Sequence, residues 1–361
     1  MPDNGHAMRA DPLRFLVIGL LAFPLVVLAI PAATFGLPLP CPAQGSWLVQ
    51  RQLTLPRRSH AGEAIGGFSA AHYDRTSDNL LLLSDLPSGM VLRWGGLGRY
   101  PAPELQRLTP LRSGPHQVLP AAMDGEGLVV LGNQWWVASE GRRSRDRPPQ
   151  LLRFDASSGK LLSAIELPAD WQPGDGQGLA SNAGPESLLL LSDRNHSQQP
   201  VLLMAAEQAL LQDPAHEVRL LRWQWPAGAD PARDAPRPQP QGALLLPRQE
   251  GWGLTDLLQT ETGQLLGLLR RFKPPDRWQI RLALYPLPPP GTTDSVPSLV
   301  EWDLIAAGLA PDNWEGLTKG PPLTDGRTTL LLVSDDNLNP LQANRLALLT
   351  EEHSVSCSDK R

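Results

Sequence analysis

Short apolar runs recur along the chain, and most of them end in an acidic residue. The runs occupy residues 80–85, 135–140, 188–193, 265–270 and 330–335. Each follows a turn in which glycine stands next to a hydrophobic residue, as in Gly66-Gly67-Phe68. Because the runs are short and bounded by glycine, aspartate and asparagine, the pattern favours strands over helices despite the many leucines.

The spacing of the runs predicts a β-propeller. The run ends at 85, 140, 193, 270 and 335 lie 55, 53, 77 and 65 residues apart, which suits blades of about 40–50 residues lengthened by loops. We expect an all-β propeller over 47–350. We favour six blades over five or seven, because a less regular sixth repeat would fit within the remaining chain.

Further elements follow from the sequence between the runs. Segments 47–55 and 345–349 are suited to closing the ring within one blade. Partner strands are predicted at 150–155, 161–167 and 280–285, with a hairpin turn between Asp155 and Gly159. We expect a short helix over 205–211 and a long inter-strand loop over the proline-rich stretch 230–241.

The N-terminal segment indicates export. Residues 15–50 contain no Asp, Glu, Lys or Arg, and 15–33 are almost continuously apolar. As a helix, these 19 residues would span about 28 Å, close to the thickness of a bilayer core. The segment 1–36 is therefore predicted to be a hydrophobic helix, either a cleaved signal peptide or, as we favour, an uncleaved membrane anchor. The rest of the chain would then lie on the periplasmic or extracellular side of the cell envelope.

Beyond the apolar segment, residues 37–46 form a predicted extended tether, and 351–361 a polar C-terminal tail. Cys41 and Cys357 lie near the two ends of the exported part. If those ends meet, an oxidising compartment would permit a disulfide between them; two unpaired thiols are the alternative.

Composition removes several function classes. The net charge of −5 leaves no basic footprint for nucleic acid. Two cysteines exclude a cysteine-rich metal module. The chain also lacks a Gly-x-Ser-x-Gly elbow, a His-Glu-x-x-His motif and a Walker loop. We expect a monomer.

Carboxylates at equivalent places in the repeat are the strongest candidates for chemistry. Glu126 and Glu315 occupy the same position in their repeats and are the predicted catalytic residues. The run ends Asp85, Glu140, Asp193 and Asp335 form a second such set, predicted to hold Ca²⁺. Equivalent positions of a propeller converge, so either set could also raise the pKa of its members for acid–base work. The alternative is that these residues cap turns.

Two arginines are candidates for substrate binding. Arg142 lies in the arginine-rich loop 142–147, and Arg270 ends the fourth run in place of an acid. Guanidinium groups bind phosphate oxygens well. Solvated surface loops are the alternative explanation for both.

The block Asn313-Trp314-Glu315-Gly316-Leu317, followed by a strand ending in Ser334-Asp335, resembles the phytase-like family, described as "esterase-like activity of phytase". The likeness extends over 65–349. It departs from the family at Gln177, where a glutamate is usual, and at Arg270. The resemblance implies a metal-dependent phosphoesterase or esterase with a small phosphorylated or ester substrate. A propeller that only binds a ligand or partner, and a purely structural one tethered at the membrane, are the alternatives.

Overall fold

Strands alone make up the regular structure, twenty-three of them in the part of the chain that the computed structural model describes. The described residues are 46–352, without 86–88, 99–101, 115–116, 119–122, 142–147, 182 and 193–198. The structure does not describe the predicted N-terminal helix, both cysteines, Arg142 and Asp193, nor most of the tether and of the C-terminal tail. The first residue of the predicted tail, Glu351, ends strand β23 (Arg345–Glu351). Within the described residues, no helix is long and apolar enough to cross a membrane.

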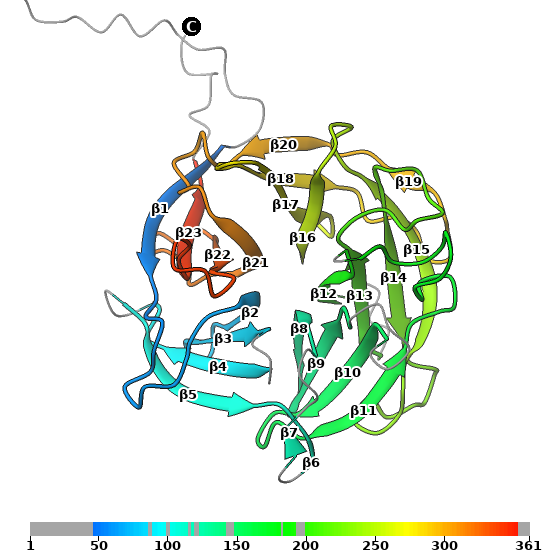
Figure 1. Cartoon of the computed structure of the whole chain (residues 1–361), viewed down its shortest axis with the longest axis horizontal. Coiled ribbons are helices and arrows are strands. Elements are labelled where there is room, and N and C mark those ends of the chain that lie inside the picture. Colours follow the sequence, from blue (N-terminus) through cyan, green and yellow to red (C-terminus); the bar gives the residue numbers. More distant parts are fainter. Residues whose placement is uncertain are drawn as a thin grey trace, which may run out of the picture. The chain divides into compact units, whose positions relative to one another are not determined.

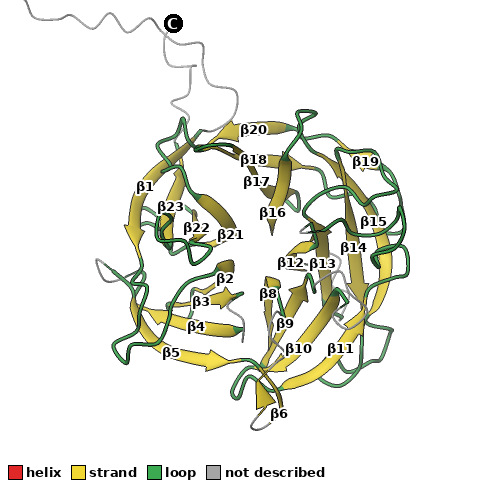
Figure 2. Ribbon diagram, viewed as in Figure 1, coloured by secondary structure: helices red, strands yellow, loops and turns green. Residues whose placement is uncertain are grey.

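Five antiparallel sheets are arranged around a common axis as the blades of a propeller (Figures 1 and 2). Blade 1 contains β2 (Phe68–Asp74), β3 (Asn79–Ser84), β4 (Met90–Gly95) and β5 (Glu104–Pro110). Blade 2 contains β8 (Gly125–Leu131), β9 (Gln134–Ser139), β10 (Gln150–Asp155) and β11 (Leu161–Glu166). Blade 3 contains β12 (Pro185–Leu191), β13 (Val201–Ala206), β14 (Glu217–Gln224) and β15 (Arg237–Leu245), with β19 (Ser295–Val296) added in parallel at its outer edge.

Blade 4 contains β16 (Trp252–Gln259), β17 (Leu265–Lys273), β18 (Arg277–Tyr285) and β20 (Val300–Asp303). Blade 5 combines β21 (Asn313–Lys319), β22 (Thr329–Asp335) and β23 (Arg345–Glu351) with β1 (Trp47–Thr54). A small hairpin, β6 (Arg112–Gly114) with β7 (Gln117–Val118), follows blade 1. The inner strands β2, β8, β12, β16 and β21 surround the axis (Figure 1).

The ring is closed by pairing of the two chain ends, as predicted. β1 runs antiparallel to β23, from Trp47 opposite Glu351 to Thr54 opposite Arg345. Because the first strand completes the last blade as its outermost strand, backbone hydrogen bonds between the two ends of the propeller close the ring.

The expectation of six blades was wrong, and the reason lies in blade 3. The run at 188–191 belongs to the inner strand β12, whereas the second strand of this blade is β13. The residues of the second strands that lie opposite the position two before each inner-strand bulge are 85, 140, 207, 270 and 335, at intervals of 55, 67, 63 and 65 residues. This even spacing accounts for five blades.

Two further expectations fail in the same blade. The stretch 205–211, predicted as a short helix, begins within strand β13 and continues into turns. The proline-rich stretch 230–241, predicted as a loop, contributes its second half to β15. Pro240 still fits a strand near the sheet edge: it needs no N–H there, and its carbonyl accepts a hydrogen bond from the Gly291 amide (2.8 Å).

The hydrophobic core lies between neighbouring blades. Four clusters of buried side chains fill these spaces, and the inner strands are apolar on both faces because each faces a neighbour on either side. Tryptophans pack edge-to-face between strands, for example Trp136 with Trp225 at 5.2 Å between ring centres.

Each inner strand carries a β-bulge near its start. The pairing register shifts between Phe68 and Ala70 in β2, and the same shift recurs at one place in each of the other four inner strands. An extra residue in a bulge bends its strand and redirects a side chain. The five bulge positions are Ser69, Glu126, Glu186, Thr255 and Glu315.

Candidate functional site

The five bulge positions carry three glutamates and two hydroxyl residues. Ser69 and Thr255 are satisfied by the neighbouring inner strand: the Ser69 hydroxyl donates to the Gly125 carbonyl and that of Thr255 to the Trp314 carbonyl. Glu126 and Glu186 differ, because they are 8% and 7% exposed and neither carboxylate has a hydrogen bond or ion pair to a described residue. Buried carboxylates without partners are costly and mark a place where a ligand or proton is expected.

A second set of side chains lies at or near the end of the second strand of each blade, opposite the residue two places before the bulge. We call these the strand-end positions: Asp85, Glu140, Glu207, Arg270 and Asp335. Each lies opposite the start of its own inner strand; the amides of Asp85, Glu140 and Glu207, for example, donate to carbonyls there at 2.8–2.9 Å. Four of the five positions therefore carry a carboxylate at the same end of the propeller axis as the bulge glutamates.

Together these residues form one acidic cluster around the axis. We define it as Asp85, Asp124, Glu126, Glu140, Glu186, Glu207, Glu315 and Asp335. The residues interact electrostatically across blades. Glu186 of blade 3 and Glu315 of blade 5, for example, both help to raise the pKa of Glu126 in blade 2. The geometry concentrates carboxyl groups at one end of the propeller axis.

The electrostatic consequence is a group of carboxyls whose pKa values are raised. Burial raises the pKa of Asp85 to about 7, with Glu315, Asp124 and Asp336 adding to the effect. Burial likewise raises the pKa of Glu140 to about 7 and that of Asp335 to about 9. The pKa values of Glu126 and Glu186 also lie well above their usual range, first because of burial and then because of neighbouring carboxylates.

Arg270 is the single strand-end residue with a positive charge, and it lies inside the cluster. Its Nη2 donates to Glu207 Oε1 at 3.1 Å, and its Nη1 donates to Glu315 Oε1 and Asn313 Oδ1. Asn313 also donates to Glu315 Oε1 at 2.8 Å, which holds this carboxylate on the guanidinium side. These neighbours raise the pKa of Arg270 although burial opposes them, so the group stays charged.

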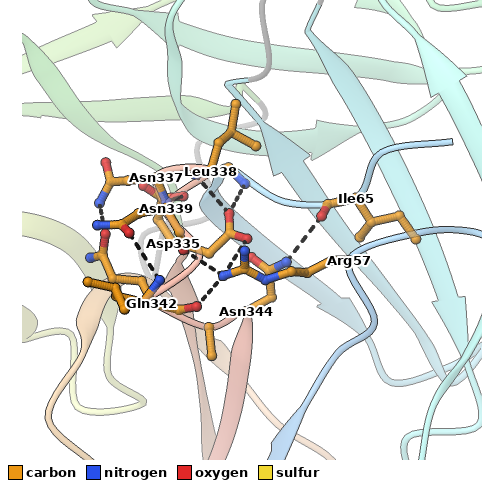
Figure 3. A network of polar contacts seen from close by, with 12 residues as sticks. Arg57, Ile65, Asp335, Asn337, Leu338, Asn339, Gln342 and Asn344 are labelled. Carbon is orange, nitrogen blue, oxygen red and sulfur yellow. Dashed lines mark hydrogen bonds and ion pairs between the residues drawn. The ribbon is translucent and has the colours of Figure 1, made fainter.

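Asp336 is adjacent to the cluster but already satisfied. Its Oδ1 accepts hydrogen bonds from the amides of Gly67 and Leu338, both at 3.2 Å, and its Oδ2 lies 3.3 Å from Arg57 Nη2. Figure 3 shows Arg57 beside Asn339 and Gln342, to whose carbonyls it donates. This network fixes the loop after β22 to the segment before β2, so we assign Asp336 a structural role.

One part of the cluster has the geometry of a cation site. Ligand oxygens of Asp124, Glu126 and Glu140 lie within 4.8 Å of one another. Hard oxygen donors of this kind suit Ca²⁺, which takes carboxylate and carbonyl oxygens at about 2.3–2.6 Å. The residues present therefore fit a calcium ion, because oxygens on opposite sides of one Ca²⁺ lie about 4.6–5.2 Å apart.

The structure brings together most of the residues singled out from the sequence. Glu126, Glu315, Asp85, Glu140 and Asp335 belong to the acidic cluster, and Arg270 lies within it. Arg142 and Asp193 lie outside the described residues, and their roles stay predictions. The sequence grouped Asp193 with Asp85 as equivalent ends of their apolar runs. The two runs are not equivalent, because residues 188–191 belong to the inner strand β12 and residues 80–84 to the second strand β3.

Sequence reasoning missed Glu186 and Glu207. Pro185-Glu186-Ser187-Leu188 matches Gly125-Glu126-Gly127-Leu128 in placing glutamate, a small residue and leucine in succession, and this signal would have found the third glutamate. The segment around Gln177, chosen in its place, precedes the blade and forms turns. Glu207 ends the apolar run 201–206, whose alanines suggested a helix.

Two cavities lie away from the cluster. One of about 210 Å³ is lined by the later parts of all five inner strands, with polar residues such as His72, Asp256 and Lys319 among the apolar ones. Another of about 570 Å³ lies against β14 and β15, and its charged residues already have partners, as Arg219 pairs with Asp170 (2.6 Å) and Asp213 (2.5 Å). Neither is lined by a residue of the acidic cluster.

Comparison with known proteins gives one family and several distant structures. No curated protein matches the chain. Similar solved structures include the Swd1 β-propeller domain of Myceliophteria thermophila (15% identity, TM-score 0.34, 76% of this chain and 64% of that one). An α-L-arabinanase of Cellvibrio cellulosa (9%, 0.42, 79% and 92%) and an N10 neuraminidase-like protein of a bat influenza virus (11%, 0.36, 80% and 80%) are others.

The family model "Phytase-like: Esterase-like activity of phytase" matches residues 63–338, from the segment before β2 to the loop after β22. The match includes every residue of the acidic cluster. It confirms the resemblance seen in the sequence, and the chain belongs to the phytase-like family.

Proposed function

We propose that this protein is a calcium-dependent hydrolase of small phosphate or other ester substrates that acts at the acidic cluster. One observation carries the proposal: Glu126 is nine-tenths buried and has no hydrogen bond or ion pair to a described residue. It also lies with Asp124 and Glu140 in a group whose oxygens fit a cation. The family description supports an esterase-like reaction.

The residues of the cluster would divide the work between them. Asp124, Glu126 and Glu140 would hold the cation. A bound Ca²⁺ supplies a Lewis acid that polarises the ester oxygen. A water molecule would attack the phosphorus or carbonyl carbon and lose a proton to solvent as the bond to the leaving oxygen breaks. Glu186, whose pKa is raised by burial and by neighbouring carboxylates, would donate a proton to that leaving oxygen. Glu315 and Asn313 would orient Arg270.

Cellular placement is part of the same proposal. The apolar segment 15–33 supports export and anchoring in the membrane, with the propeller on the outer side and acting as a monomer. Extracellular or periplasmic calcium would then be available to the cluster.

The test is hydrolysis of p-nitrophenyl phosphate and p-nitrophenyl acetate by the purified protein, with CaCl₂ and after EDTA. We expect calcium-dependent turnover of at least one ester and a loss of at least tenfold in Glu126→Gln. Glu261→Gln, which removes an exposed carboxylate from a turn, should keep the wild-type rate. Turnover that is absent, insensitive to EDTA, or unchanged in Glu126→Gln would contradict the proposal.

A non-catalytic calcium-binding propeller is the second candidate. A specific observation favours it: the Arg270 guanidinium already donates to Glu207, Glu315 and Asn313, and these contacts compete with the binding of a phosphate. Calcium binding without hydrolysis of either ester would support this function over the first.

A further inference from the structure

The acidic cluster is asymmetric, and Arg270 causes the asymmetry. At the five strand-end positions the other blades carry Asp85, Glu140, Glu207 and Asp335. The fourth blade alone places a positive charge among them. The cluster therefore has one side with a built-in cation and one side without.

On the side of Arg270, three oxygens from three residues point at one guanidinium. These are Glu207 Oε1, Glu315 Oε1 and Asn313 Oδ1. Carboxylate and amide oxygens gathered in this way are the donors that Ca²⁺ prefers. The Arg270 side chain is 16% exposed, so its charge is held away from water.

On the other side, Asp124, Glu126 and Glu140 bring their oxygens within 4.8 Å of one another. Glu186 connects the two sides electrostatically, because Glu207, Glu315 and Arg270 on one side and Glu140 on the other all affect its pKa. This glutamate is 7% exposed and has no hydrogen bond or ion pair to a described residue. A buried, unpartnered carboxylate between the two places indicates that the cluster has more acceptors than Arg270 satisfies.

We propose that Arg270 permanently occupies the second of two cation positions, so that the cluster takes one divalent cation, at Asp124, Glu126 and Glu140. Removal of the guanidinium opens a second calcium position formed by Glu207, Asn313 and Glu315. The inference rests on the proposed function in one respect only, namely that the cluster binds a cation; it does not require catalysis.

Isothermal titration of the full-length protein with CaCl₂ measures the number of ions directly. We expect one Ca²⁺ per chain for the wild type and two for Arg270→Gln. Arg270→Lys keeps the charge and should keep one. Arg271→Gln is the matched control, because Arg271 bonds to Gln249 and Gln279 outside the cluster, and its loss should leave the stoichiometry at one.

A second pair of variants tests the division of the cluster with Arg270 in place. Glu140→Gln should weaken calcium binding at least tenfold, whereas Glu207→Gln should change the affinity less than threefold. This pair keeps the inference testable if Arg270→Gln fails to fold.

The outcomes separate the inference from the proposed function. A wild type that binds no calcium would remove the cation site and both claims with it. One ion in the wild type and still one in a folded Arg270→Gln would overturn the inference alone. Equal losses in Glu140→Gln and Glu207→Gln would also overturn it, because the two sides would then form a single site.

Discussion

Glycine makes room for individual carboxylates of the cluster. A Cβ at Gly253 would lie 2.6 Å from Glu207 Oε1, and its other near neighbours are Cγ and Cδ of the same side chain. We therefore predict that Gly253→Ala displaces Glu207 from Arg270 and lowers the free energy of unfolding by about 1–3 kcal/mol. Urea denaturation followed by tryptophan fluorescence measures the change.

A Glu207→Ala background provides the control. Since the three atoms nearest to the new methyl group all belong to Glu207, Gly253→Ala should cost much less when Glu207 is already alanine. A double-mutant cycle reports this coupling. Equal costs in the two backgrounds would show that the glycine is required for its backbone and not for space.

Arg57 gives a second prediction at this scale. It pairs with Asp336, a side chain only 2% exposed, and donates to two loop carbonyls. Arg57→Ala leaves a buried carboxylate without its charged partner, so we expect a loss of about 1–3 kcal/mol in unfolding free energy. Arg233→Ala breaks an exposed pair with Asp230 and should cost less than about 0.5 kcal/mol. Chemical denaturation of both variants tests the contrast; similar losses would contradict it.

Among the elements, the inner strands leave the least room for larger side chains, because their backbones pack closely against one another around the axis. A Cβ at Gly127 of β8 would lie 2.6 Å from the backbone nitrogen of Leu188 in β12. A Cβ at Gly267 of β17 would meet only side chains, the nearest at 3.0 Å. Backbone cannot yield as a side chain can, so Gly127→Ala should lower the melting temperature clearly more than Gly267→Ala. Differential scanning calorimetry of the two variants decides; the reverse order would count against close strand packing.

The sequence predicted where strands occur, but it did not always show which position a strand takes within its blade. The apolar runs at 80–85, 135–140 and 330–335 were predicted as strands, and they prove to be the second strands of their blades. In blade 3 the inner strand, 185–191, is just as apolar, because an inner strand is buried on both faces and shows no alternation. The pattern of hydrophobic residues therefore could not distinguish β12 from a second strand, and Glu186 and Glu207 were missed as a result.

At the scale of the molecule, circular symmetry converts a sequence repeat into a site. Glu126 and Glu315 are 189 residues apart in the chain, yet in the folded ring Glu315 helps to raise the pKa of Glu126. The sequence repeat showed that the two positions are equivalent. The geometry of a propeller then predicted that equivalent positions converge near the axis. The role of Arg270 as an ion-pair partner was not readable, because its partners come from blades 3 and 5, on either side of its own.

The whole cluster should make stability depend on pH and on calcium. In the folded state the pKa values of Asp85 and Glu140 are about 7 and that of Asp335 is about 9, all above the ordinary carboxyl values. The native state thus holds protons that the unfolded chain releases, so stability is fully present below about pH 4 and is lost as the pH rises through 7 to 9. In EDTA, we expect the melting temperature to fall between pH 5 and 9.

Calcium should act against this loss, because it binds the deprotonated cluster and stabilises the native state by mass action. We expect millimolar CaCl₂ to raise the melting temperature more at pH 8 than at pH 5. Asp85→Asn should flatten the pH dependence in EDTA, since one of the titrating groups is gone, whereas Asp230→Asn, on an exposed loop, should not. A melting temperature in EDTA that does not change between pH 5 and 9 would mean that the carboxyls ionise in the folded protein as freely as in the unfolded chain. The acidic cluster would then make no pH-dependent contribution to the free energy of unfolding.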